Sequence, residues 1–326
     1  MNAWTHFKKR KLNLLGLMLV LFLFLLAIFA PLLANSEPLY ASIDNKVYFP
    51  LFHSMASYSE LSLEKLHDSN FQRREEVFLL WAPIPFSPFQ YDLDAILEAP
   101  SSKHFLGTDE QGRDVAARLI YGARISLSVG FIAVGIYVLI GIFLGALAGY
   151  FGSLVDGVIS RVIEVVICFP TFFLILTVLA LVGPSIYNVM IVIGLTGWTG
   201  IARLLRGEFL KLRETDFVLA AKALGASSLR TIFRHILPNA LTPVFVSATF
   251  GIASAILTES ALSFLGLGVQ PPDPSWGHML SNSRDYIDFA WWLALFPGLA
   301  IFLTILSFNL VGEGLRDALD PRGRAA

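Results

Sequence analysis

The stretch "RETDFVLAAKALGASSLRTIFRHILPN", Arg213 to Asn239, is charged and alanine-rich in a chain that is otherwise mostly apolar. The residues from Asp216 onward favour a short helix, and Gly225 is the residue type that accepts the left-handed conformation at a helix end. Ser227 is a suitable N-cap for a second helix, which Pro238 then ends. The pattern therefore predicts a helix, a glycine turn and a second helix.

Spacing alone leaves two interpretations of this pair of helices open. The second helix, predicted over Ser228 to Ile236, can lie on a membrane surface with its apolar side chains among the headgroups and Arg230 and Arg234 on phosphates. Alternatively, the pair docks onto a soluble partner. The alanines of the first helix favour docking, because small side chains let another surface approach closely.

The composition of the whole chain indicates a membrane protein. Of its 326 residues 55% are hydrophobic and only 15% are charged, whereas a soluble domain has about 25% charged residues. A net charge of −1 and the lack of a basic and aromatic stripe argue against nucleic acid as a partner. The single cysteine, Cys168, lies in an apolar run and has no partner in the chain for a disulfide or a metal site.

Six apolar runs are long enough to span a bilayer, which needs about 20 helical residues. The first is 22 residues long, and we expect a retained anchor because a secretory signal has an apolar region of about 7–15 residues; a cleaved signal is the alternative. The runs cover Leu12 to Leu33, Ile125 to Tyr150, Val162 to Val182, Tyr187 to Leu205, Leu241 to Gly266 and Phe289 to Leu310.

Lysine and arginine predict the orientation of these spans, because short cytoplasmic loops carry the excess of positive charge. With the N-terminus inside, the inner segments hold fifteen cations and the short outer loops hold one, Arg284. Both termini are therefore expected in the cytoplasm. The three predicted regions are residues 1–34, with the tail and first span, an extracytoplasmic insertion at 35–124, and a five-helix core at 125–326 with a cytoplasmic loop at 206–239.

The insertion and the second span have distinct sequence patterns. The phrases "KVYFPLF" and "LLWAPIPFSPFQYDLD" of the insertion have the aromatic and proline-punctuated character of short strands and turns, so we expect a small folded or membrane-hugging unit. In the second span Gly141, Gly145 and Gly149 share one helical face at four-residue spacing. This pattern predicts close packing against another membrane helix.

The stretch "AAKALGASSLRTIFRHILPN" resembles the coupling-loop signature of permease subunits of ATP-binding-cassette importers. Three further stretches and the N-terminal anchor are similar to the dipeptide and oligopeptide branch, C-subunit type. The stretches are "LGTDEQGRDVAARLIYGARISL" from Leu106, "ESALSFLGLGVQPPDPSWGHML" from Glu259 and "WWLALFPGLAIFLTILSFNLVGEGLRDALDPR" from Trp291. The resemblance covers nearly all of the chain except roughly residues 35–102.

The resemblance implies an all-α integral membrane protein of the type I importer permease fold, with six transmembrane helices and an extracytoplasmic insertion after the first. It implies a subunit of an ATP-driven peptide importer in the bacterial inner membrane, beside a second permease subunit, two ATPase subunits and an extracytoplasmic peptide-binding protein. Transport selectivity would lie largely in that binding protein. The expected ATPase-coupling residues are Asp216, Ala220, Ala221, Lys222, Leu224, Gly225, Ala226, Ser227, Arg230, Phe233 and Pro238.

The chain departs from the family pattern at two places. Leu219 stands where the signature has a glutamate before its two alanines, so a salt bridge made by that glutamate is not expected here. The insertion is longer than in most dipeptide permeases, and its "YFP" and "LLWAPIPFSP" phrases look more like the subgroup that carries oligopeptides and microcin C-type peptides.

Ionisable residues inside membrane spans are costly and therefore candidates for function. Glu164 and Glu259 are the candidates for the translocation path, and the alternative for Glu164 is an interfacial ion pair with Arg161. The histidines are not spaced as metal ligands, and a GxxxxGK[ST] phosphate loop is absent, so ATP and magnesium are expected on partner subunits.

Two other classes of protein fit the sequence less well than a transport subunit. A secondary transporter is disfavoured because inverted repeats and a chain of buried acids are lacking. A membrane enzyme is disfavoured because no nucleophile with a base or metal constellation is found, so catalytic and metal-binding residues are not expected.

Overall fold

The computed structural model describes residues 3–43, 46–49 and 77–319. The described chain is mainly helical, and it falls into two compact units. Unit 1 comprises residues 1–21, 128–269 and 301–326, and unit 2 comprises residues 22–127 and 270–300. Helices α2, α6 and α14 contribute residues to both units.

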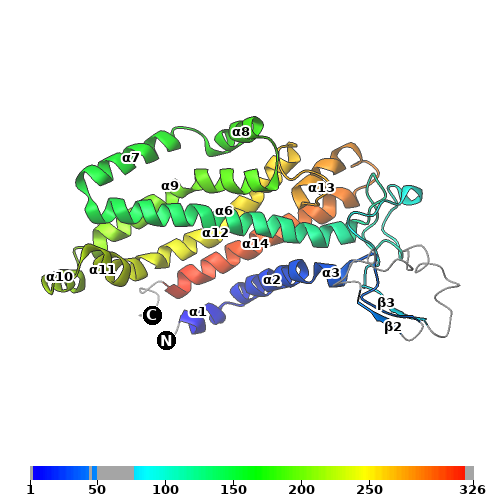
Figure 1. Cartoon of the computed structure of the whole chain (residues 1–326), viewed down its shortest axis with the longest axis horizontal. Helices are drawn as coiled ribbons and strands as arrows, with labels where there is room; N and C mark the ends of the chain where they lie inside the picture. Colours follow the sequence, from blue (N-terminus) through cyan, green and yellow to red (C-terminus); the bar gives the residue numbers. More distant parts are fainter. Residues whose placement is uncertain (1–2, 44–45, 50–76, 320–326) are drawn as a thin grey trace. The chain divides into compact units, whose positions relative to one another are not determined.

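The elements follow one another along the chain with a small sheet between the first two long helices (Figure 1). Their bounds are α1 Ala3–Lys9, α2 Lys11–Ile28, α3 Ala30–Leu33, β1 Tyr40–Ile43, β2 Lys46–Tyr48, β3 Val77–Leu80, η2 Leu93–Ala95, α6 Val115–Phe151, α7 Ser153–Ile167, α8 Thr171–Val182, α9 Ile186–Leu212, α10 Asp216–Ala223, α11 Ser228–Arg230, η3 Thr231–Ile236, α12 Leu237–Phe264, α13 Trp276–Asn282, η4 Ser283–Asp285 and α14 Trp292–Leu319.

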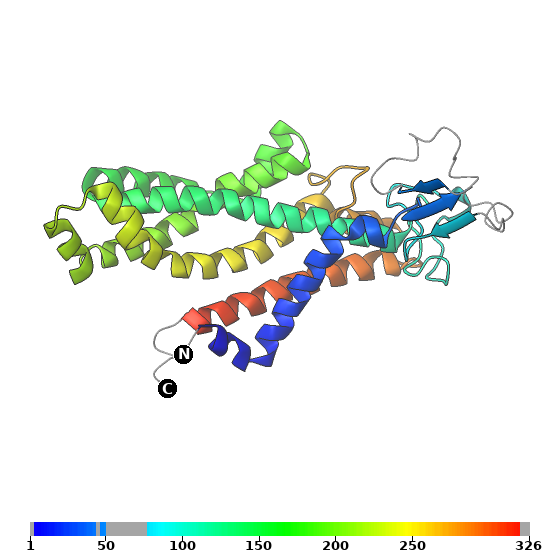
Figure 2. The same cartoon turned by 60° about the horizontal axis from the view of Figure 1, so that its bottom comes forward.

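Unit 1 is a helical bundle in which glycines allow the closest approaches, and the predicted glycine face of α6 packs on α9. A Cβ atom at Gly141 would lie 2.6 Å from Cβ of Ile201, and one at Gly145 would lie 2.6 Å from the carbonyl oxygen of Ala202. A Cβ atom at Gly149 would lie still closer to Cβ of Phe209. Helix α12 packs on α9 as well, and α6, α9 and α12 run alongside one another in both views (Figures 1 and 2).

Unit 2 contains a three-stranded antiparallel sheet in the order β2-β1-β3. Strand β2 lies in the first phrase that predicted strands and β3 overlaps the second at Leu79 and Leu80, whereas β1 was not predicted. Ala41 and Ile43 are buried on one face of the sheet. The same unit contains the polar segment that leads into α6, together with α13 and the start of α14. Part of the predicted insertion, residues 44–45 and 50–76, lies outside the described residues.

Five described helices are long and apolar enough to cross a membrane, and a sixth span is possible if α7 and α8 together form one. The predicted span Val162–Val182 is not formed by one straight helix, because α7 and α8 are bent by 80° at the break between them. Pro170 explains the break. Proline lacks the N–H that a continuous helix needs, and it disfavours helical geometry at the preceding residue, Phe169.

The prediction that Pro238 ends a helix is wrong. Helical structure continues from Ser228 to Phe264 through the π-helical turn η3. Pro238 lies in the first turn of α12, where a missing N–H is tolerated, and a π turn shifts the hydrogen-bonding pattern by one residue just before it. The helix that contains the predicted span Leu241–Gly266 therefore begins inside the polar stretch, at Ser228.

Candidate functional site

The polar stretch between α9 and α12 folds as the predicted helix, glycine turn and helix, here called the 216–236 element. Gly225 has a φ of +80°, as the sequence predicted. Two backbone hydrogen bonds close the end of α10, from Gly225 N to Lys222 O at 2.9 Å and from Ala226 N to Ala221 O at 3.0 Å. This pair of bonds is a Schellman motif, which requires a left-handed residue at the glycine position.

Ser227 begins the second helix as predicted. Its Oγ accepts a hydrogen bond from the backbone N–H of Arg230 at 3.4 Å, and Thr231 Oγ1 donates to the Ser227 carbonyl at 3.0 Å. Because the helix then runs without a break into α12, the turn is joined rigidly to a membrane-spanning helix. The 216–236 element and α12 therefore share one continuous helix.

The apolar residues of the element lie on two different faces. Val218, Ile232 and Ile236 are buried, whereas Leu224 is 89% exposed and Leu229 and Phe233 are also exposed. The surface-lying interpretation required Leu229, Ile232, Phe233 and Ile236 to share one lipid-facing side. The structure separates them, so two of these side chains anchor the element and two are presented outward.

The remaining predicted coupling residues surround the exposed part of the element. Asp216 is the first residue of α10, and Ala220, Lys222 and Arg230 are exposed, while Ala221 and Ala226 are half-buried. The ammonium of Lys222 lies 5.5 Å from the ring centroid of Tyr150. Leu219 is exposed, and it adds an apolar side chain where the family signature has a charge. Pro238 is exposed just beyond the element.

The two glutamates predicted for a translocation path have different environments. Glu164 is exposed and pairs with Arg161 at 2.6 Å, which is the alternative that the sequence left open. Glu259 is fully buried in α12, where Ser263 Oγ donates to its carboxylate at 2.7 Å and in turn accepts from Val269 N at 3.1 Å. This geometry indicates that Glu259 holds the chain turn after α12, and a path role for either glutamate stays a prediction.

A second polar site lies in unit 2, in the segment that leads into α6. Asp109 Oδ2 binds Arg113 Nε at 2.7 Å and Arg118 Nε at 3.3 Å, while its Oδ1 accepts from the backbone N–H groups of Gln111 and Arg113. These three charged side chains are almost completely buried. Asp109 therefore organises the turn from which α6 begins.

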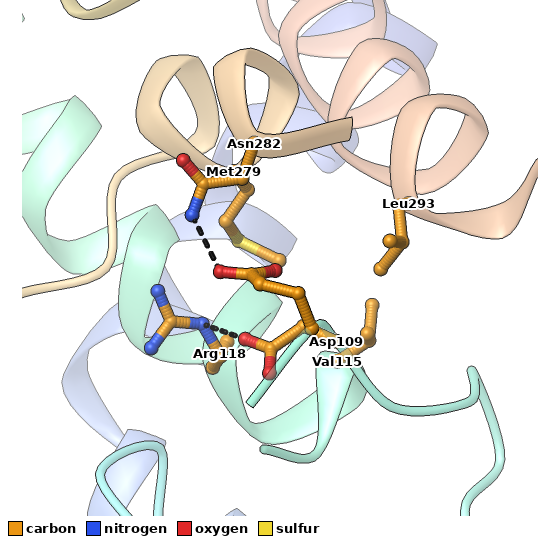
Figure 3. Close-up of a pocket in the computed structure, with 7 residues that line it drawn as sticks. Asp109, Val115, Arg118, Met279, Asn282 and Leu293 are labelled. Atoms are coloured by element: carbon orange, nitrogen blue, oxygen red, sulfur yellow. Dashed lines mark hydrogen bonds and ion pairs between the residues drawn. The ribbon is translucent and has the colours of Figure 1, made fainter. Parts of the chain in front are cut away.

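Glu110 connects this cluster to α13. Its Oε1 accepts from Asn282 Nδ2 at 2.9 Å and from Arg113 at 3.2 Å. Asp109, Arg118 and Asn282, with Met279 and Leu293, surround a void of about 10 Å³, which has room for one water molecule (Figure 3). Burial, and next the nearby Asp109, raise the pKa of the Glu110 carboxyl.

A larger cavity of about 340 Å³ is also lined by Glu110, together with Arg113, His278, Asn282 and Asp285. Burial lowers the pKa of His278, and Arg118 and Arg113 lower it further. Within the described residues no group of three or more His, Cys, Asp or Glu side chains could hold a metal ion. The cavity thus presents hydrogen-bonding groups and charges of both signs.

The sequence did not single out the charged residues of this cluster, although Asp109 to Arg118 lie in a stretch that was quoted for its family resemblance. A signal was present. Asp109 and Arg113 have the four-residue spacing of an ion pair, and Arg118 is an unusual residue so close to an apolar run. Only the fold shows that all three are buried together.

The sequence matches two known protein families. Residues 141–325 match the family described as binding-protein-dependent transport system inner membrane component, and residues 1–50 match the N-terminal transmembrane domain of oligopeptide transport permease C. The dipeptide transport system permease protein DppC of Alkalihalophilus pseudofirmus is 41% identical over 98% of this chain and 89% of the relative.

Two further matches extend this result. The DppC protein of Bacillus subtilis is 37% identical over 99% of this chain and 86% of the relative. Among solved structures, a chain of the MetNI methionine ABC transporter in an inward-facing conformation gives a TM-score of 0.51 at 18% identity, over 62% of this chain and 97% of that one. At this identity the structural match supports the fold alone.

Proposed function

This chain belongs to the family of binding-protein-dependent transport system inner membrane components, and on that premise we propose that it is the permease subunit of a peptide importer. Membership makes it a membrane component of an ATP-driven importer. The peptide assignment is supported by the names of both full-length relatives, which are dipeptide permeases.

The length of the outer insertion does not separate dipeptides from longer peptides. Both DppC relatives align over at least 98% of this chain, so they include the region of the insertion. An oligopeptide or microcin C-like substrate, suggested by the phrases in the insertion, is therefore the alternative to a dipeptide, and both are peptides.

The 216–236 element is the proposed docking site for an ATPase subunit, and hydrolysis of ATP with magnesium is assigned to that partner. The observation that carries this proposal is the exposed apolar group Leu224, Leu229 and Phe233 on a turn that continues into α12. Exposed apolar side chains favour burial against a partner, and the unbroken helix supplies a rigid connection to the bundle.

The proposed complex is completed by a second permease subunit, a second ATPase subunit and an extracytoplasmic peptide-binding protein. The proposed location is the bacterial inner membrane with both termini in the cytoplasm, and this orientation is supported by the distribution of lysine and arginine.

The proposed function is tested with the assembled complex in proteoliposomes, with ATP inside and the binding protein and a radiolabelled dipeptide outside. We expect accumulation that requires both ATP and the binding protein, and that unlabelled dipeptides and tripeptides reduce by competition. Free amino acids should not compete, because they lack the peptide bond and the spacing between the two charged termini.

The matched control is a complex whose ATPase subunits bind ATP but cannot hydrolyse it, and it should show no accumulation. ATP-driven uptake of a solute that is not a peptide, with no competition by peptides, would overturn the substrate assignment but leave the family membership intact.

A further inference from the structure

The small sheet of unit 2 has a group of apolar side chains on each of its faces. Its inner face buries Ala41 and Ile43 against Tyr48, Val77, Leu79 and Trp81. Strand residues alternate between faces, so a sheet with one face in water normally carries polar side chains on the other face. This sheet departs from that rule.

The register places a second apolar group on the opposite, outward face, here called the outward sheet face. Ser42 lies between Val47 and Phe78, and Tyr40 lies opposite Leu80. The ring centroid of Tyr40 lies 5.5 Å from that of Phe49 and 6.1 Å from that of Phe78, and both ring pairs have edge-to-face geometry. The members of this face are Tyr40, Ser42, Val47, Phe49, Phe78 and Leu80, and none carries a charge.

Most of this face is open to its surroundings. Phe78 is 61% exposed, and Val47, Phe49 and Leu80 are each about half exposed. The inner face already forms the core of the sheet, so these side chains are not needed for its packing. An apolar group of this kind indicates contact with another apolar phase or partner.

Backbone hydrogen bonds join the chain just after the sheet to the residues that follow the first candidate span. Ile84 N–H donates to Leu33 O at 3.0 Å, and Asn35 N–H donates to Ile84 O at 3.1 Å. Leu33 is the last residue of α3, and Leu80, the last residue of β3, is four residues from Ile84. Four extended residues span at most about 14 Å, so the sheet is held close to the point where the chain leaves the membrane.

We propose that the outward sheet face lies in the headgroup layer of the bilayer, next to the exit of the first span. Aromatic and aliphatic side chains without charges suit this layer, where tyrosine in particular is enriched. The exposed apolar surface of the same unit is continuous in sequence from the lipid-facing residues of α2 and α3, such as Phe22, Ile28 and Leu32, to the sheet. Figure 2 shows the sheet directly beyond α3 within this unit.

This inference does not depend on the transported substrate or on which side of the membrane the sheet occupies. It assigns to part of the insertion a role as an anchor on the membrane surface. Such an anchor would fix the tilt of the first span relative to the bilayer, because a sheet bound to both the helix end and the headgroups resists tilting of that helix.

The test uses the full complex in lipid nanodiscs, with Cys168→Ser removing the single native cysteine. Phe78→Cys and Leu80→Cys, each labelled with the environment-sensitive dye NBD, report on the outward sheet face. We expect a blue-shifted emission at both positions, with a loss of about half of the fluorescence when lipids carry a nitroxide in the headgroup region. A nitroxide near the end of the acyl chains should quench much less.

The matched control is Leu93→Cys, at a residue of η2 that is 75% exposed and lies outside the sheet. It should show water-like emission and little lipid quenching. Co-elution of the partner subunits shows that each variant is assembled, and agreement between two positions guards against a local effect of one substitution.

Two results would overturn the proposal. A blue shift without quenching by any lipid nitroxide would show that protein covers this face, either another segment of this chain or a partner subunit. Water-like emission at both positions would show that the face is in solvent.

Discussion

Gly225 is the residue on which the geometry of the 216–236 element depends. Its φ of +80° lies in the region that is costly for residues with a Cβ atom, and it closes the hydrogen-bonded end of α10. No heavy atom lies within 4 Å of the position that a Cβ would occupy. A substitution there is therefore opposed by the backbone conformation and not by a steric clash.

Gly225→Val should disable coupling while leaving membrane insertion intact. A β-branched residue at a positive φ costs about 1–3 kcal/mol, so the turn should shift to another conformation and misplace Leu224 and Leu229. The measurement is recovery of the ATPase subunits on purification, together with ATP hydrolysis stimulated by loaded binding protein. Both should fall.

The control for this change is Gly207→Val in α9. Gly207 is exposed, has helical geometry and also has no heavy atom within 4 Å of its Cβ position. It should assemble normally. If Gly225→Val also gave normal assembly and normal stimulated hydrolysis, the 216–236 element would not be the docking site that we propose.

At the scale of elements, the contact between α6 and α9 is formed around glycines. Lipid removes the hydrophobic drive between helices, so contact energy comes from close packing, and the glycines of α6 permit it. Gly194 and Gly197 of α9 reciprocate, with Ile136 and Tyr137 of α6 packed over them. Larger side chains of each helix thus pack against glycines of the other helix.

Gly145→Ala should destabilise this helix pair. The added methyl group would lie 2.6 Å from the backbone oxygen of Ala202, which cannot rotate away, so the helices must separate. Overpacking of this kind costs about 1–3 kcal/mol. The melting temperature of the detergent-solubilised complex, followed by fluorescence-detected size-exclusion chromatography, should fall.

Gly135→Ala on the same helix is the matched control. Gly135 is exposed, with no heavy atom within 4 Å of its Cβ position. Replacing a helical glycine by alanine there should be neutral or stabilising, by about 0.5–1 kcal/mol. Equal melting temperatures for the two alanine variants would contradict the packing argument.

At the scale of the whole molecule, the bent pair α7 and α8 decides the topology. If the pair crosses the membrane, the chain has six spans, and the 216–236 element lies on the same side as the N-terminus. If it does not cross, five spans remain and the element lies on the opposite side. The count of apolar runs predicts six spans, but the helix lengths leave both cases open, because α7 and α8 are each shorter than a full span.

Cysteine labelling at Ser227 distinguishes them. In a Cys168→Ser background, Ser227→Cys should resist a membrane-impermeant maleimide in intact cells and react after permeabilisation, because six spans place it in the cytoplasm. Leu93→Cys should react in intact cells. Reaction of Ser227→Cys in intact cells would exclude the six-span topology with a cytoplasmic N-terminus.

The sequence by itself determined the features that depend on local chemistry. Apolar run lengths identified the candidate membrane-spanning segments, Gly225 and Ser227 identified the turn, and the spacing of Gly141, Gly145 and Gly149 identified a packing face. The order of the quoted stretches identified the family. In each case the physical cause acts within a few residues or one helical face, so it can be read without knowledge of the fold.

Only the tertiary structure decided which residues meet and where helices bend. It showed that Pro170 breaks a span whereas Pro238 does not, because a proline's effect depends on the hydrogen bonds that surround it. It buried Asp109 with Arg113 and Arg118, and it left a face of the small sheet exposed. These outcomes depend on contacts between segments distant in sequence, and the burial of a charge or the exposure of an apolar side chain is decided by those contacts.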